Sequence, residues 1–180
     1  MKKFMENWEW DYDRVGQLDH YKSGDLIVLG VYPEGETFGG TDKLSMSIAP
    51  QVVEFLDANE DKIIIFEGDR LNSKKFFQTV LDKGWNLKIV ALDVSQEERE
   101  RRYAERGSDQ DPTWLAGRIS KVENVVKEFG TQQTLFGEEE GCVVSFVHDT
   151  PASTEVISEW IQEEINETIL NLVIQEEFDS

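Results

Sequence analysis

Four residues that are able to support chemistry follow the most apolar run of the sequence. The run IIIF, residues 63–66, leads directly into Glu67, Gly68, Asp69 and Arg70. Carboxylates organise a metal ion or a water molecule, and a guanidinium binds a phosphate or a carboxylate through paired hydrogen bonds. We therefore predict that Glu67, Asp69 and Arg70 are catalytic residues. The structural alternative is a surface strand end that is held by salt bridges.

A second group is basic, and it gathers much of the scarce positive charge of the chain. Arg99, Arg102 and Arg106 recur at helical spacing, and Arg118 and Lys121 follow beyond the polar turn GSDQD. Two helices joined by such a turn can close over a polyphosphate and supply charge-assisted hydrogen bonds to it. We predict a phosphate-binding lid near residues 99–121. Spacing alone equally allows two solvated helices whose basic side chains pair with neighbouring glutamates.

The stretch GETFGGTDKLS has glycines, a hydroxyl and a lysine in close order, but it is not a Walker A loop. That loop requires G-x-x-x-x-G-K-[ST], whereas Thr41 and Asp42 follow Gly40. Helix capping explains Thr41 or Asp42, but the pair Gly39 and Gly40 indicates the close approach of a backbone or a ligand. We predict that Thr41, Asp42 and Ser45 either bind a small polar ligand or cap a helix.

The elements that must position these residues alternate along the chain from residue 25. Short apolar runs predict strands at residues 25–32, from Lys62 onward, 86–94 and 142–149. Amphipathic stretches predict helices at residues 44–57, 73–84, 95–107, 111–129 and from Thr150 onward. This alternation predicts an α/β fold with a parallel sheet in three layers, covered by helices on both faces. We expect an N-terminal segment, residues 1–24, and one domain, residues 25–180.

Several residues mark where the predicted helices begin. Ser95 is a predicted N-cap with Glu98 in the capping-box position, and Asp111 precedes Pro112 as a second N-terminal signal. Pro50 falls within the helix predicted at residues 44–57, where it indicates either a kink or a later start.

Composition limits the classes of partner. The 180 residues carry a formal net charge of -19, with 39% hydrophobic and 11% aromatic residues. These values favour a folded domain and disfavour nonspecific attraction to nucleic acid or to an anionic membrane. No apolar run is long enough to span a membrane, no secretory signal opens the sequence, and there is one cysteine. We expect a cytoplasmic protein without a membrane partner.

Metal binding is not predicted. His20 and His148 are far apart in the sequence, and no cysteine–histidine metal spacing is present.

Three segments taken together resemble the nucleoside and nucleotide kinase group of P-loop proteins, especially phage-encoded kinases of deoxynucleotides or of modified DNA bases. The segments are FGGTDKLSMS, IIIFEGDRL and RRYAERGSDQDPTWLAGRISKVENV, and the similarity covers roughly residues 25–150. The resemblance implies that Asp69 and Arg70 lie beside the acceptor and the nucleotide phosphates. It also implies that residues 39–45 line the acceptor pocket, as a substrate-binding segment.

The same resemblance implies that the lid carries its phosphate-binding arginines at Arg102, Arg106 and Arg118. The sequence departs from the group in one respect, because the group begins with a central strand, the P-loop and its helix. This sequence begins with MKKFMENWEWDYDRV and contains no Walker A motif. We expect a P-loop-kinase-like fold that lacks the first strand, with the gap filled by the run ILNLVI, the N-terminal aromatic residues or a second copy.

The sequence is compatible with three functions. The first is a phosphotransferase acting on a deoxynucleotide or a modified DNA base, with ATP and Mg²⁺ as cofactors. Because the P-loop supplies much of the positioning and charge neutralisation, this function needs a homodimer or a P-loop-bearing partner, or the chain is truncated. The second is an inactive descendant that still binds a nucleotide or nucleoside. The third is an acidic, non-enzymatic protein that mimics DNA and inhibits a DNA-binding protein.

Overall fold

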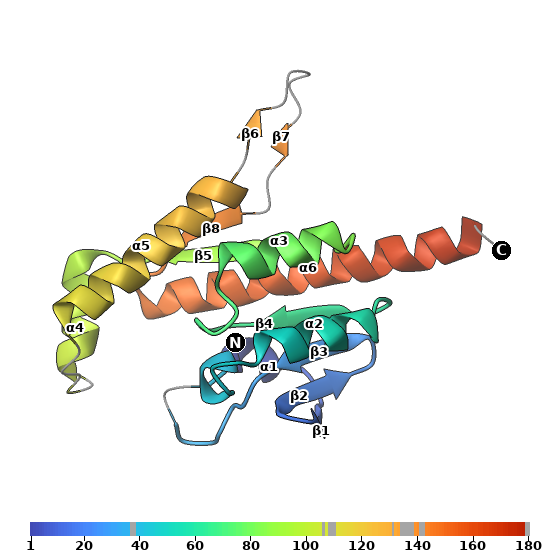
Figure 1. The fold of residues 1–180 in the computed structure, drawn as a ribbon, viewed down its shortest axis with the longest axis horizontal. Helices are drawn as coiled ribbons and strands as arrows, with labels where there is room; N and C mark the ends of the chain where they lie inside the picture. Colours follow the sequence, from blue (N-terminus) through green and yellow to red (C-terminus); the bar gives the residue numbers. More distant parts are fainter. Residues whose placement is uncertain are drawn as a thin grey trace. The chain divides into compact units, whose positions relative to one another are not determined.

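The computed structural model describes residues 1–36, 39–105, 107, 111–130, 132–133, 139–140 and 143–178. The chain forms two compact units, each assembled from segments that are distant in sequence (Figure 1). Unit 1 contains Met1–Ser45, Asp61–Glu67 and Thr150–Ser180, and unit 2 contains Met46–Glu60 and Gly68–Asp149.

Unit 1 is built on a four-stranded sheet with the order β1-β2-β3-β4. Its strands are β1 (Asp11–Val15), β2 (Leu18–Ser23), β3 (Leu26–Leu29) and β4 (Ile63–Phe66). The strands β3 and β4 are parallel, with Leu26 opposite Ile63, whereas β1, β2 and β3 form antiparallel pairs. The parallel pairing predicted for the strands from residue 25 onward is confirmed for β3 and β4, and the sheet as a whole is mixed because β1 and β2 join it in antiparallel order. The charged segment DYDRV forms an exposed edge strand, and LDHYKS forms a strand that buries Leu18 and His20, so neither strand needs a continuous apolar run.

The core of unit 1 joins the sheet to two helices, α1 (Lys2–Met5) and α6 (Pro151–Phe178). Phe4, Leu26, Val28 and Ile165 form a buried cluster, and the N-terminal tryptophans pack against it. The run ILNLVI lies within α6, so the expectation that it could replace a strand is wrong. The run is part of a continuous 28-residue helix, in which each added residue gains one backbone hydrogen bond, and that continuity outweighs the β-branched composition of the run.

In the described residues of unit 2, a two-stranded parallel sheet and a short antiparallel hairpin are combined with four helices. The parallel pair is β5 (Ile89–Asp93) with β8 (Val143–Val147), and the hairpin is β6 (Gln132–Gln133) with β7 (Glu139–Glu140). The helices are α2 (Ala49–Asp57), α3 (Lys74–Asp82), α4 (Gln96–Glu105) and α5 (Pro112–Phe129). The aromatic ring of Phe77 in α3 packs edge-on against Phe129 in α5, with 5.8 Å between the ring centroids.

Two helix starts confirm signals that the sequence predicted, and in one of them a single expected hydrogen bond is replaced. Pro50 marks a later start, because α2 begins at Ala49 with the proline in its first turn. Ser95 caps α4, and its Oγ accepts the backbone N–H of Glu98 at 3.3 Å. The reciprocal bond expected of a capping box is not formed: Asp149 Oδ1 accepts the Ser95 N–H at 2.8 Å.

The side chain of Glu98 binds two arginines instead. Arg101 and Arg102 both donate hydrogen bonds to it. These bonds lower the pKa of Glu98 to about 2, and the bond from Arg101 has the larger effect. A carboxylate gains more from two guanidinium donors than from one neutral N–H, which explains why the box stays half-formed. Within the described residues, none of the helices is long and apolar enough to cross a membrane.

The N-cap of α3 provides a test of local helix stability. The Ser73 Oγ accepts the backbone N–H of Phe76 at 3.2 Å, which satisfies one of the donors that the helix leaves unpaired. We expect Ser73→Ala to lower the free energy of unfolding by about 1 kcal/mol, measured by urea denaturation. Ser73→Thr keeps the hydroxyl and should lose much less. Equal losses in the two variants would contradict the assigned cap.

Candidate functional site

The arrangement in unit 2 that is best suited to bind a ligand is a cluster of one carboxylate and two cations, which we call the Asp69 cluster. It consists of Asp69, Arg118 and Lys121. The Arg118 Nη1 lies 3.2 Å from Asp69 Oδ2, and the Lys121 Nζ lies 3.1 Å from Asp69 Oδ1. Lys121 also donates to the backbone carbonyl of Asp69 at 3.1 Å. The fold thus brings together a residue that follows β4 and two residues that were predicted to bind phosphate.

The Asp69 cluster is positively charged and open to solvent. One carboxylate and two cations leave a formal charge of +1, which favours an anionic ligand. The side chains of Asp69, Arg118 and Lys121 are 21%, 34% and 36% exposed, so the donors remain accessible. Because Arg118 and Lys121 are three residues apart in α5, they project from the same face of the helix.

Trp114 is a part of this region that the sequence analysis missed. The Arg118 guanidinium lies over its indole ring, 4.5 Å from the centroid, and the side chain is 47% exposed. The i, i+4 spacing of Trp114 and Arg118 on a predicted helix was the signal that could have identified the pair. The stack holds the guanidinium in place beside Asp69.

The other predicted lid residues are placed differently. Arg102 donates from Nε to Glu98 at 2.6 Å and from Nη2 to the carbonyl oxygen of His148 at 2.7 Å, and its Nη1 lies 3.1 Å from His148 Nδ1. Its donors therefore tie α4 to the segment after β8. Arg106 lies outside the described residues. Arg70 follows Asp69 in unit 2 and is partly buried.

The predicted glycine segment lies in unit 1, where two backbone segments approach closely. Gly40 exchanges two backbone hydrogen bonds with Val31, at 3.1 and 2.8 Å. Thr41 is fully buried and donates both its backbone N–H and its hydroxyl to the carbonyl of Glu67, at 2.9 and 2.8 Å. The alternative of a close backbone approach is therefore confirmed for Gly40.

The other residues predicted to bind substrate or to act in catalysis are divided between the two units. Thr41–Lys43 form a single 3-10 turn rather than the start of α2, so Asp42 is exposed on a turn and Ser45 is partly buried beyond it. A Cβ on Gly39 would lie 3.0 Å from both the Tyr32 ring and the Val31 carbonyl. Glu67 is 46% exposed and belongs to unit 1, while Asp69 and Arg70 belong to unit 2.

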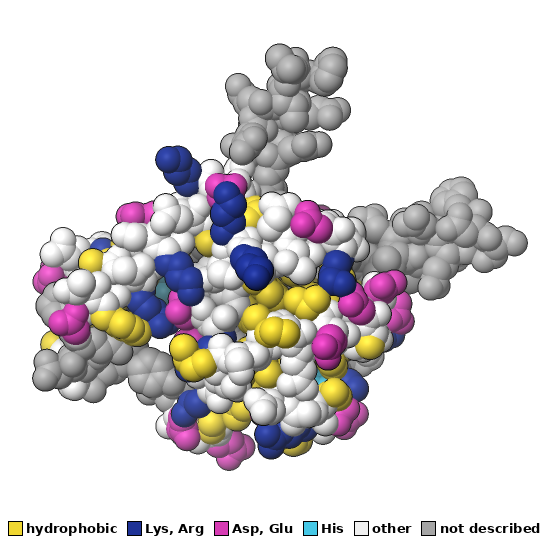
Figure 2. Space-filling view, in the orientation of Figure 1, with side chains coloured by type: hydrophobic (Ala, Val, Ile, Leu, Met, Phe, Trp, Pro, Cys, Tyr) yellow, Lys and Arg dark blue, Asp and Glu magenta, His cyan; other side chains and the backbone are white. Residues whose placement is uncertain are grey.

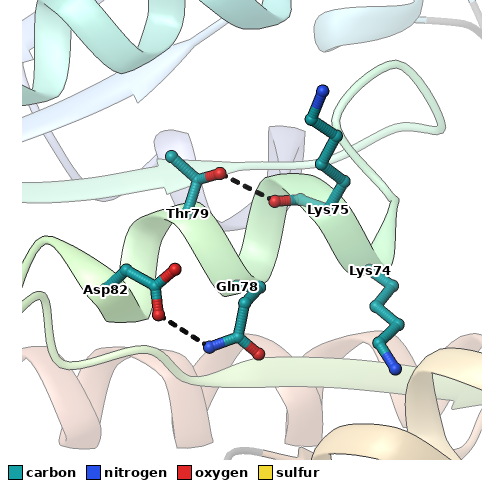
Figure 3. A pocket seen from close by; sticks show the side chains of 5 residues that line it. All are labelled: Lys74, Lys75, Gln78, Thr79 and Asp82. Carbon is teal, nitrogen blue, oxygen red and sulfur yellow. Dashed lines mark hydrogen bonds between the residues drawn. The ribbon is translucent and has the colours of Figure 1, made fainter.

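The structure shows a hollow along α3 that does not have the features of a binding site (Figure 3). It has a volume of about 480 Å³ and is lined by Lys74, Lys75, Gln78, Thr79 and Asp82. The Thr79 hydroxyl donates to the carbonyl of Lys75 at 2.9 Å, and Gln78 donates to Asp82 at 2.8 Å. All five side chains come from one helix, and their polar groups pair along it rather than converge on a shared point.

His20 is a buried titratable group that links pH to the stability of unit 1. It is fully buried, its Nδ1 lies 3.4 Å from the carbonyl of Leu18, and its Nε2 lies 3.6 Å from Asp13 Oδ2. Burial lowers the pKa of His20, and burial followed by the charge of Arg102 lowers the pKa of His148. Both shifts favour the neutral imidazole in the folded protein.

We expect the protein to become less stable as the pH is lowered from about 7.5 to about 5, because the unfolded chain takes up protons at the ordinary histidine pKa, near 6.5, before the folded protein does. Above the unfolded pKa the contribution is constant, and it is lost as the pH falls toward the lowered folded pKa. Urea denaturation at several pH values measures the slope. His20→Gln should reduce the slope, and a slope that is unchanged in both His20→Gln and His148→Gln would contradict this origin.

The described residues show no metal centre, since no three histidine, cysteine or carboxylate side chains form a group that could hold a metal ion. A family model described as P-loop Nucleotide Kinase3 matches residues 11–161. The chain shows no significant match to a curated protein or to a solved structure.

Proposed function

Because the chain belongs to the P-loop Nucleotide Kinase3 family, we propose that it binds a nucleotide at the Asp69 cluster and acts in phosphoryl transfer. The observation that carries the proposal is the convergence of Asp69, Arg118 and Lys121 within a sequence that matches the family from residue 11 to residue 161. The acceptor is a deoxynucleotide or a modified DNA base.

The three side chains have different roles in the proposed site. Arg118 and Lys121 donate charge-assisted hydrogen bonds to a phosphate group of the nucleotide. Asp69 holds both cations in position and is a hydrogen-bond acceptor for the hydroxyl that receives the phosphoryl group. Trp114 fixes the plane of the Arg118 guanidinium, so less side-chain freedom is lost when phosphate binds.

The phosphate donor needs groups beyond those in the Asp69 cluster. ATP is the donor that the family implies, and its outer phosphates are bound by a Walker A loop, which residues 1–180 do not contain. Nor do the described residues fit Mg²⁺ held by the protein alone, because both Asp69 oxygens already accept from cations. We therefore assign no step to the metal and propose that a P-loop is supplied by residues outside this sequence.

The strand pairing supports a place for such a segment. Among the described strands, β4 in unit 1 pairs only with β3, and β5 in unit 2 pairs only with β8. β4 stands at the end of the strand order, and an edge strand presents backbone groups with which one more strand can pair. The proposed fold is a P-loop-kinase core whose first strand and P-loop come from elsewhere.

A ligand that binds only the folded protein raises its melting temperature, so thermal unfolding tests the proposal directly. We expect deoxynucleoside monophosphates at saturating concentration to raise the melting temperature, and deoxynucleosides without phosphate to raise it less. Mg-ATP should have a smaller effect than the monophosphates, because the donor site is incomplete. No shift with any of these ligands would contradict the proposal and would favour the acidic, DNA-mimicking alternative, which competition with DNA for a DNA-binding protein then tests.

A further inference from the structure

A groove between α3 and α5 in unit 2 concentrates positive charge in a strongly acidic protein. It has a volume of about 490 Å³ and is lined by Ser73, Lys74, Lys121, Asn124, Val125, Lys127 and Glu128. Three lysines and one glutamate leave the lining with a formal charge of +2. The whole chain has 18 basic and 37 acidic residues, so this balance is the reverse of the average. Figure 2 shows Lys and Arg side chains gathered over α3 and α5.

The lysines reach the groove from both of its walls. Lys74 opens α3, and Lys121 and Lys127 lie on α5. Lys74 pairs with Glu128 across the groove, whereas no carboxylate in the described part of the chain pairs with Lys127. The N-terminus of the nine-residue α3 adds its partial positive charge on the same side as Lys74.

We propose that this α3–α5 groove binds the phosphate groups of an anionic ligand, at a site additional to the Asp69 cluster. Ammonium groups on facing helices can contact several phosphate oxygens at once, and the Asn124 amide and the Ser73 hydroxyl add neutral hydrogen-bonding groups. Lys121 lines the groove and also binds Asp69, so the two sites are neighbours on one helix. A ligand with a chain of phosphates, such as inorganic tripolyphosphate or a nucleoside triphosphate, has the matching charge and length.

Glu128 provides the sharpest test, since among the described residues it is the only carboxylate that lines the groove. Glu128→Gln removes that charge and releases Lys74, and we expect it to tighten the binding of inorganic tripolyphosphate by about threefold to tenfold. Titration calorimetry at low salt measures the affinity. Damage to the fold would weaken binding, so it does not account for a gain in affinity. An affinity that is unchanged or weaker in Glu128→Gln overturns the proposal.

Matched lysine variants test the location of binding. Lys127→Gln and Lys74→Gln should each weaken tripolyphosphate binding by about threefold to tenfold. Lys75→Gln is the control, because Lys75 is adjacent in sequence but extends from α3 in the direction opposite to Lys74 (Figure 3). We expect its affinity to match that of the unmodified protein. An equal loss of affinity in Lys75→Gln and Lys127→Gln would show diffuse electrostatic attraction to the surface and would overturn the proposed site in the groove.

Two further measurements identify the ligand chemistry. Binding should weaken steeply as the salt concentration rises, because screening acts on exposed lysines. Competition then distinguishes the sources of phosphate: displacement of tripolyphosphate by ATP identifies a nucleotide as a ligand, and no displacement identifies an inorganic phosphate chain. Lys121 belongs to both sites, whereas Lys74, Lys127 and Glu128 lie outside the Asp69 cluster. The variants of these three residues therefore distinguish a failure of the groove from a failure of phosphoryl transfer at the Asp69 cluster. No detectable binding of tripolyphosphate overturns the proposal.

Discussion

Gly30→Ala should lower the free energy of unfolding by about 3 kcal/mol or more, which is a large part of the stability of a typical domain. Gly30 has a φ of +114°, a region that side chains rarely adopt. A Cβ at this position would lie 2.3 Å from the carbonyl carbon of Gly40 and 2.6 Å from its oxygen. Both contacts are to backbone, so a change of rotamer cannot relieve them.

Gly24→Ala is the matched control for this substitution. Gly24 also has a positive φ, of +59°, but nothing lies within 4 Å of the Cβ position. The control therefore carries the backbone penalty alone, about 1 kcal/mol. Urea denaturation of the two variants separates strain from steric overlap. If both variants lose the same stability, the close approach of Gly30 and Gly40 does not limit the residue at position 30.

Removing the two cations of the Asp69 cluster should produce the largest functional effect. We expect Arg118→Gln and Lys121→Gln each to weaken the binding of a deoxynucleoside monophosphate by about tenfold to a hundredfold. Each variant loses a charge-assisted hydrogen bond to phosphate, and Arg118→Gln also loses the stack on Trp114. Equilibrium binding measured by calorimetry, or by the shift in melting temperature, reports the change.

Asp69→Asn should act in the opposite direction on the same binding. The amide keeps the shape of the side chain but removes the negative charge that faces both cations, so we expect the monophosphate to bind at least as tightly as before. Arg101→Gln is the arginine control, because Arg101 pairs with Glu98 and Glu105 on α4 and has no contact with Asp69. Equal losses in Arg118→Gln and Arg101→Gln would contradict phosphate binding at the cluster.

Local sequence patterns were sufficient to predict most of the elements that position the site. The apolar runs became β3, β4, β5 and β8, and the amphipathic stretches became α2 to α6. Strands β1 and β2 were not predicted as strands, because DYDRV and LDHYKS are polar and their pairing depends on β3. A solvated strand is stabilised by side-chain pairs with the neighbouring strand, and the sequence of one segment does not show which strand that is.

The Ser95 cap shows the same limit at the level of one hydrogen bond. The sequence pattern correctly identified Ser95 as the N-cap of α4, since a cap forms between residues three apart. The partner of its backbone N–H is Asp149, which is 54 residues away, and the glutamate expected there binds arginines. Local spacing identified Glu98 as a possible acceptor for the Ser95 N–H. The fold brings Asp149 to that N–H and arginines to Glu98, and these contacts decide which acceptor is used.

The sequence by itself determined the kinds of residue that are available for phosphate chemistry and the order of the elements that carry them. Residue types and helical spacing selected Asp69, Arg118 and Lys121, but as two unrelated groups. Only the tertiary structure decided that α5 delivers both cations to Asp69, and that Arg102 binds Glu98 and His148. An ion pair depends on the separation of its charges in space, and distance along the chain does not fix that separation.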